Sequence, residues 1–331
     1  MNGTDSEHAG RTGGVSLRFV ALLILLFGAS GPTGSAWAQT RQVDAGMPAA
    51  LTVEYFDAAG NAVRSTNGTL VRQGLVVPLS ALAGITEVRA LARDGKRWST
   101  EALIALHPES DLALLAISDI PAYAIDVPRS ATFTKQSDVF LVRGPGGSGA
   151  ETVTATVYGK FSIRGPDFLG LSQGVPSGAP GFRSDGALLG ICFDLSRDGI
   201  LLDYLASPAS IENLIAGRGE PVSLRDLTPP VLPAYQDPDS LAGLVFRGAL
   251  LTTTDRPEEA HRFLQRALDR DPTNATAHFW MGKLFFAQGR HEEAADAFRR
   301  AADIDPSFHL AWHMAGVAES QAGRYPQALE M

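Results

Sequence analysis

The chain has 331 residues, of which 45% are hydrophobic and 19% are charged, and its net charge is −8. This length is enough for two domains with cores of their own, and the composition excludes a largely disordered chain. The acidic balance argues against a nucleic-acid partner, which would require a basic face.

The first 38 residues have the pattern of a signal peptide. Arg11 and Arg18 precede a short apolar run over 19–27, and small residues follow as far as Ala38. The apolar run is too short to span a bilayer as a stable helix. We therefore expect cleavage after Ala38, a periplasmic or secreted protein, and no membrane association after cleavage. An uncleaved signal that anchors the protein in a membrane is the alternative.

The sequence over 43–218 predicts an all-β domain. Short runs rich in Val, Ile, Leu and Thr alternate with Gly, Pro and Asp, a pattern typical of a sandwich or of two small barrels. Ser207-Pro208 near the end of this region indicates the start of a short helix. A linker over 219–239 follows, since its prolines hold the backbone extended.

From residue 240 onward the sequence is helical and repetitive. Small residues recur 34 positions apart, as in Gly248, Gly282 and Gly316. This period, with small residues where two helices approach and a closing Asp-Pro, is typical of tetratricopeptide repeats. The pattern predicts repeats over 241–274, 275–308 and 309–331, of which the third is incomplete.

A serine lies among small and turn-forming residues in the stretch Gly174–Cys192, where Ser177 precedes a tight Asp185-Gly186 turn and an apolar run. Together with HPESDLALLAI over 107–117, this stretch resembles the trypsin-like peptidase domain in its bacterial heat-shock-protease form. The resemblance covers residues 50–215 and implies a double β-barrel. It also implies that Ser177 would be the nucleophile and that Asp111 would orient the catalytic histidine.

The catalytic histidine of that family is missing. GTLVRQGLVVPLSALAG over 68–84 resembles the histidine segment, and the histidine position falls on Ala81, or on Ser80 if the alignment slips by one. A serine without an adjacent base is a weak nucleophile. His107 is the remaining histidine of the β-region and is the alternative base.

The serine loop also departs from the family pattern. The family has a glycine two residues before the serine, whose N–H helps to form the oxyanion hole, and here that position is Val175. Pro176 between them removes a further N–H. The resemblance therefore implies a retained scaffold in which Ser177 and Asp111 are vestigial.

Three other features have simple interpretations. The glycine-rich run 144–149 lacks the Gly-Lys-Ser/Thr end of a phosphate loop, so we expect a β-loop. His309 and His313 have a spacing that metal ligands use but no third ligand, so no metal and no cofactor is expected. The one cysteine, Cys192, is expected to be a buried small hydrophobe.

The tetratricopeptide resemblance also implies a concave groove that binds a protein or peptide partner. Its lining would be mostly apolar with one cation, and consists of Thr276, Phe279, Lys283, Phe286, Leu310, His313 and Val317. Packing of this face within the superhelix or against the β-domain is the alternative.

The sequence therefore predicts a secreted, non-catalytic binding or scaffold protein that joins a pseudo-protease β-domain to a peptide-binding groove. The first alternative is an active trypsin-like serine endopeptidase with a displaced general base and repeats that recruit a partner. In a second alternative, the β-domain is a structural spacer.

Overall fold

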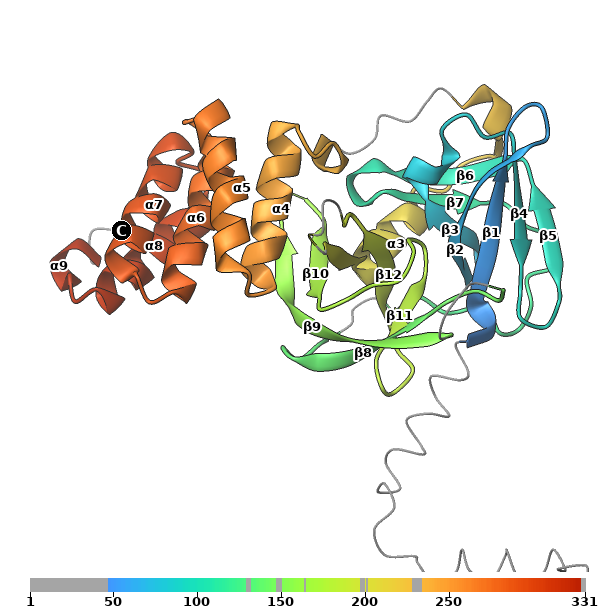
Figure 1. The fold of residues 1–331 in the computed structure, drawn as a ribbon, viewed down its shortest axis with the longest axis horizontal. Coiled ribbons are helices and arrows are strands. Elements are labelled where there is room, and N and C mark those ends of the chain that lie inside the picture. Colours follow the sequence, from blue (N-terminus) through green and yellow to red (C-terminus); the bar gives the residue numbers. More distant parts are fainter. Residues whose placement is uncertain are drawn as a thin grey trace, which may run out of the picture.

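The structure is a computed structural model that describes residues 47–128, 132–146, 151–163, 165–196, 200, 202–227 and 234–328. The predicted signal peptide and the central prolines of the predicted linker lie outside these residues. Two β-units come first along the chain and a helical array follows (Figure 1). Within the described ranges, no helix combines the length and the apolar character needed to cross a membrane.

The first β-unit is a curled eight-stranded sheet in the order β14-β6-β7-β3-β2-β1-β4-β5. Leu51, Val53 and Tyr55 alternate along β1 and are fully buried, as a strand with one core-facing side requires. The strands are β1 (Ala50–Phe56), β2 (Ala62–Val71), β3 (Gly74–Pro78), β4 (Glu87–Leu91), β5 (Arg97–Thr100), β6 (Ala102–His107), β7 (Leu112–Leu115) and β14 (Val222–Ser223).

The second β-unit is a closed barrel in the order β10-β13-β12-β11-β8-β9. Aliphatic side chains such as Leu141 and Leu205 fill its interior, while Phe168 and Tyr204 point to its outer face. Its strands are β8 (Ser137–Val142), β9 (Thr152–Ser162), β10 (Asp167–Leu171), β11 (Pro180–Phe182), β12 (Leu188–Asp194) and β13 (Asp203–Ala206).

The predicted all-β region is thus confirmed, with one refinement to the double barrel. The second unit is closed by hydrogen bonds, whereas the first is a curled sheet that has β14 and β5 at its edges. The predicted short helix is also confirmed as α3 (Pro208–Ala216), which has Ser207 at its N-cap and proline at its first position.

The C-terminal helices form antiparallel hairpins, as the 34-residue period predicts. A Cβ atom on Gly248 would lie 2.5 Å from Leu264 Cγ, and one on Gly282 would lie 2.7 Å from Phe298 Cδ1. Glycine recurs because each hairpin brings a side chain against this backbone position. The helices are α4 (Leu241–Thr253), α5 (Pro257–Arg270), α6 (Ala275–Ala287), α7 (His291–Ile304), α8 (His309–Gln321) and α9 (Tyr325–Ala328).

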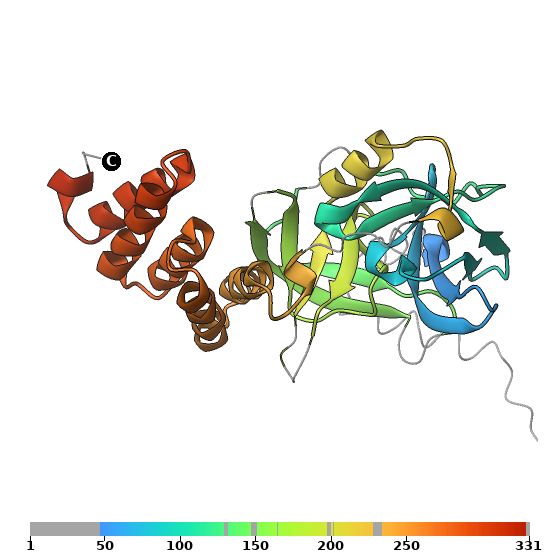
Figure 2. The ribbon, with the colours of Figure 1, turned by 90° about the horizontal axis from the view of Figure 1, so that it is seen from above.

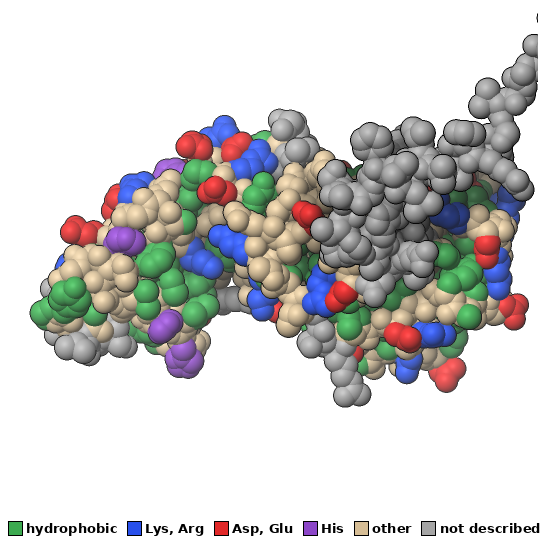
Figure 3. All heavy atoms as spheres, turned by 90° about the horizontal axis from the view of Figure 1, so that it is seen from below, with side chains coloured by type: hydrophobic (Ala, Val, Ile, Leu, Met, Phe, Trp, Pro, Cys, Tyr) green, Lys and Arg blue, Asp and Glu red, His purple; other side chains and the backbone are tan. Residues whose placement is uncertain are grey.

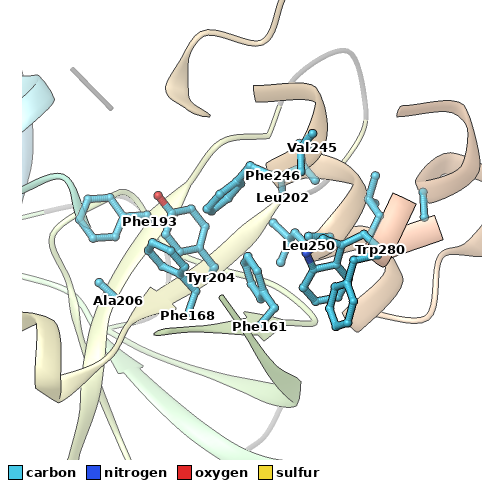
Figure 4. Close-up of a cluster of buried hydrophobic side chains, with 14 of the residues drawn as sticks. Phe161, Phe168, Phe193, Leu202, Tyr204, Ala206, Val245, Phe246, Leu250 and Trp280 are labelled. Atoms are coloured by element: carbon cyan, nitrogen blue, oxygen red, sulfur yellow. The ribbon is translucent and has the colours of Figure 1, made fainter. Parts of the chain in front are cut away.

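The helical array packs directly on the outer face of the barrel and extends away from the first sheet (Figure 2). Phe246 of α4 is fully buried, with ring centroids 5.3 Å from Phe161 and 5.2 Å from both Phe168 and Tyr204 (Figure 4). Trp280 of α6 also meets Phe161, at 6.3 Å. Edge-to-face aromatic packing of this kind makes the contact specific in geometry.

The end of the linker takes part in the same contact. The short turn η5 (Ala234–Gln236) stacks Tyr235 on Phe246, with ring centroids 4.3 Å apart. The Arg247 guanidinium donates to the Tyr235 carbonyl at 3.0 Å. The linker therefore ends in a turn that is fixed between the barrel and the array.

Candidate functional site

Asp111 lies at the turn between β6 and β7, directly after the short helix η3 (Pro108–Ser110). Its backbone is left-handed, with φ of 56°, a conformation that aspartate tolerates better than most residues. The residue is only 1% exposed. The turn therefore places a carboxylate inside the molecule, between the first sheet and the barrel.

The side chain that faces Asp111 belongs to Ser80. The Ser80 N–H donates to Asp111 Oδ1 at 2.6 Å, and the Ser80 hydroxyl donates to Oδ2 at 2.7 Å. Ser80 lies in η2 (Leu79–Leu82), the turn that follows β3. Ala81 is buried in the core of the first sheet. Of the two positions considered for the missing histidine, Ser80 is the one that is bonded to the aspartate.

A residue from the linker also reaches this carboxylate. The side chain of Gln236, in η5, hydrogen-bonds Asp111. Burial raises the pKa of Asp111 from its ordinary value of 3.8 to about 6, and the bonds from Ser80 and Gln236 oppose that rise. The aspartate thus binds a serine and a linker residue.

The loop that carries Ser177 is held by strand β2. Asn67 donates its N–H to the Ser177 carbonyl at 3.0 Å and its side-chain amide to the Pro176 carbonyl at 2.6 Å. The Thr69 hydroxyl donates to the Gly178 carbonyl at 2.9 Å. These bonds come from an unbroken strand, so β2 fixes the backbone of the loop over 176–178.

The serine loop abuts the end of β3. Gly178 has φ of +94°, and a Cβ atom there would lie 3.1 Å from Pro78 Cδ, two residues before Ser80. The fold thus brings the Ser177 loop and the Ser80–Asp111 pair to one region. The Ser177 hydroxyl itself accepts the N–H of Asp194 at 3.2 Å. Its partner is a backbone donor and not a basic side chain.

The alternative base His107 lies on β6, where its Nδ1 atom is 3.9 Å from Glu109 Oε2. The hydroxyl of Ser177 and the ring of His107 therefore have different neighbours.

Val175 is buried beside the barrel interior, and its carbonyl accepts a weak bond from the Cys192 thiol at 3.6 Å. Cys192 is fully buried, which confirms the expected small hydrophobe, and burial raises the pKa of its thiol.

One further buried carboxyl near the serine loop has no motif in the sequence. Asp203 of β13 is 5% exposed and accepts the N–H of Gly174. Burial, and then the charge of Asp194, raise the pKa of Asp203 to about 7. Because Asp203 stands alone in an apolar run, nothing in the sequence separates it from a surface aspartate.

The predicted groove residues divide into two sets. Thr276 and Phe279 are buried, and Phe279 packs on Phe298 and Phe308 with centroids 5.5 and 4.8 Å away. These two positions line the core of the array instead of an open groove, because aromatic rings from the outer helix and the next turn cover them. The alternative of packing within the superhelix holds at these positions.

The other groove positions are accessible. Lys283 and Phe286 are half-buried, Leu310 is 53% exposed, and His313 is exposed. His313 and Val317 line a hollow of about 690 Å³ together with Gly316 and Ala328, on the side of α8 where the preceding hairpins place a partner helix against the glycine. The Lys283 ammonium lies over the Trp280 ring, 4.9 Å from its centroid.

The histidine pair of α8 and the glycine-rich run are the other two features that the sequence singles out. No group of three or more His, Cys, Asp or Glu side chains that could hold a metal ion occurs in the part of the chain that the structure describes. The N–H of Gly144, at the start of the glycine-rich run, donates to Asn67 Oδ1 at 3.0 Å. This residue therefore packs against the β-unit, and positions 147–149 lie outside the described residues.

Comparison with known proteins finds one family model that matches part of the helical array. Residues 250–307 match the family model of the tetratricopeptide repeat. No curated protein matches the chain.

The chain is similar to several solved proteases over half to two thirds of its length. The Rv3671c protease from M. tuberculosis in its active form is 18% identical, with a TM-score of 0.48 over 67% of this chain and 98% of that one. The serine endoprotease from Yersinia pestis is 16% identical, with a TM-score of 0.48 over 56% of this chain and 67% of that one. The MamO protease domain from Magnetospirillum magneticum is 17% identical, with a TM-score of 0.42 over 51% and 96%.

Proposed function

We propose that the protein is a secreted, non-catalytic scaffold, in which a pseudo-protease β-domain supports an array that binds a protein or peptide partner. The β-units supply a rigid base, and the accessible face of α6 and α8 supplies the binding surface. Secretion rests on the signal-peptide pattern of residues 1–38. N-terminal sequencing of the exported protein should give Gln39 as its first residue, and retention of Met1 would contradict cleavage.

The observation that carries the proposal is the Ser80–Asp111 pair. In a serine hydrolase, a base must lie within hydrogen-bonding reach of the nucleophile and an acid must orient that base. Here the acid is hydrogen-bonded by the Ser80 hydroxyl, which is no base near neutral pH. The Ser177 hydroxyl accepts a backbone N–H, which does not activate it.

The binding role is supported by the face that the array leaves open. Lys283 and Phe286 of α6 stay half-buried, although α5 and α7 both pack against α6. Apolar side chains of this kind on the inner helices of a repeat array suit an extended or helical peptide.

Hydrolysis of fluorogenic peptides and of casein tests the non-catalytic part. We expect the wild type and Ser177→Ala to give the same background rate. A rate that Ser177→Ala abolishes would establish the alternative, an active endopeptidase.

Binding to a peptide array tests the proposed binding role of the helical array. Leu310→Asp and Val317→Asp should each reduce binding, and the exposed outer-helix variant Ile304→Asp should leave it unchanged. Equal binding by all three variants would show that the face of α8 does not bind the peptide.

A further inference from the structure

We propose that the groove takes an acidic, partly apolar peptide, whose carboxylates bind between Lys283 of the array and Lys135 of the barrel. This inference rests on the proposed peptide-binding function and specifies the partner. It assigns a site that the array forms only together with the barrel.

The inner helices carry almost no negative charge. Across α4, α6 and α8, all of which the structure describes, the one acidic residue is Glu319. Glu319 is fully buried and ion-paired with Arg299 and Arg324. The outer helices α5 and α7, by contrast, carry pairs of glutamates in their first turns. The binding face is therefore free of exposed carboxylates in a chain whose net charge is −8.

Lys283 is a charged residue of the inner helices whose side chain remains accessible to solvent. Arg247 of α4 is 3% exposed and bonds backbone carbonyls, including that of Tyr235. Lys283 is half-buried over the Trp280 ring. Partial burial strengthens the attraction of an ammonium for a carboxylate, because less water screens the pair.

The barrel brings a second lysine to the same place. The Gln136 N–H, next to Lys135, donates to the Val157 carbonyl of β9 at 2.8 Å. Two residues further along β9, a Cβ atom on Gly159 would lie 3.1 Å from Thr253 Cγ2 of α4. The Lys135 loop and the array therefore meet at one strand. After burial, the charge of Lys135 is the second cause that lowers the pKa of Lys283.

These two lysines lack the partners that the others have. The sequence contains four lysines. Lys96 donates to the Asp119 carbonyl at 2.6 Å, and Lys160 pairs with Asp167 at 2.9 Å. Among the described residues, Lys135 and Lys283 form no ion pair. Lys and Arg side chains gather where the array meets the barrel, beside apolar side chains of the array (Figure 3). A carboxylate between the two ammonium groups would neutralise their mutual repulsion.

The partner chemistry follows from this arrangement. Alternate side chains of an extended peptide point the same way, so acidic residues can face the lysines while apolar residues pack on Phe286 and Val317. The probes are fluorescein-labelled octapeptides of alternating Glu and Leu, Gln and Leu, or Lys and Leu. Fluorescence anisotropy with the full chain measures their binding at 50 and 300 mM NaCl.

We expect the Glu–Leu peptide to bind most tightly and to weaken with salt. Lys135→Gln and Lys283→Gln should each weaken it by about five-fold, the size of one partly screened ion pair. Lys283→Arg should retain binding, and the ion-paired control Lys160→Gln should leave it unchanged. Melting curves of the variants confirm that each one folds.

Two different results would overturn the inference. If the Gln–Leu peptide binds as tightly as the Glu–Leu peptide and neither lysine variant weakens it, the acidic partner is wrong while the peptide groove stands. If none of the three peptides binds, the array does not bind peptides in this groove, and the proposed binding function is contradicted as well.

Discussion

The Ser80 hydroxyl donates a hydrogen bond to Asp111 Oδ2 at 2.7 Å, and the Ser80 N–H donates to Oδ1 at 2.6 Å. Asp111 joins three parts of the chain, namely its own hairpin turn, the η2 turn and the linker turn η5.

The first prediction concerns the pH dependence that Asp111 gives to stability. Its pKa is about 6 in the folded state and 3.8 ordinarily, so the folded state holds this proton more tightly. The contribution of Asp111 to stability is therefore full below pH 4 and is lost as the pH rises through 6. Asp111→Asn removes that loss. The change in unfolding free energy caused by the substitution should be more favourable at pH 7.5 than at pH 4.5, by about 2 kcal/mol.

Urea unfolding at the two pH values measures this difference. Asp126→Asn, at an exposed aspartate that pairs with Arg72, is the control and should show a difference below about 0.5 kcal/mol. Equal effects of Asp111→Asn at both pH values would mean that the carboxyl titrates normally.

The second prediction concerns the linker. Gln236→Ala removes an amide donor from a buried carboxylate and should destabilise the protein by about 1–2 kcal/mol. It should also accelerate proteolysis at Arg225 and Arg218, because η5 would no longer be fixed. Gln265→Ala is a matched control, since Gln265 bonds Asp269 at 2.9 Å on the exposed face of α5. That bond should contribute only a few tenths of a kcal/mol. Equal proteolysis of both variants would show that the Gln236 bond does not hold the linker.

The third prediction concerns the contact between the barrel and the array. Phe246→Ala removes a fully buried ring from the aromatic cluster and should destabilise the protein by about 3–5 kcal/mol. Hydrogen exchange should become faster in β9 and β10 as well as in α4, because the ring packs on Phe161 and Phe168. Phe298→Ala, an equally buried ring within the array, should affect α6 to α8 and leave β9 and β10 protected. Protection of β9 and β10 in both variants would contradict the interface.

The fourth prediction concerns the serine loop. A Cβ atom on Gly178 would lie 2.0 Å from the Asn67 carbonyl oxygen at a φ of +94°. Gly178→Ala should therefore destabilise the protein by more than about 3 kcal/mol, through a backbone clash as well as strain. Gly60 has a similar φ of +80° but nothing within 4 Å of its Cβ position, so Gly60→Ala should cost only about 1 kcal/mol. Thermal unfolding compares the two variants. Equal losses of stability would mean that the positive φ alone, and not the clash with the Asn67 carbonyl, requires glycine at position 178.

Local patterns predicted much of this fold. The spacing of Gly248 and Gly282 predicted the helical hairpins because each glycine meets a side chain of the partner helix. The loop around Ser177 predicted the protease-like β-units because its turns and apolar strand are contiguous in sequence. The same local information left the histidine position ambiguous between Ala81 and Ser80, and of these two residues Ser80 is the one that hydrogen-bonds Asp111.

Long-range contacts explain what the sequence missed. Gln236 meets Asp111 across 125 residues, as their numbers show, and no motif marks a linker glutamine as a ligand of a carboxylate. Thr276 and Phe279 have the spacing of groove residues, but burial depends on Phe298 and Phe308, which the periodicity does not place. Lys135 joins Lys283 only because the array packs on β9, and that contact depends on the aromatic face of the barrel.

Labelling of the intact protein with a fluorophosphonate probe, read by mass spectrometry, tests the central claim most directly. Such probes bond to a serine that an adjacent base activates. The account predicts no labelling at Ser177, because its hydroxyl accepts the Asp194 N–H and the residue bonded to Asp111 is Ser80. A mass increase at Ser177 that is lost in Ser177→Ala, with an active serine hydrolase labelled in parallel, would contradict it.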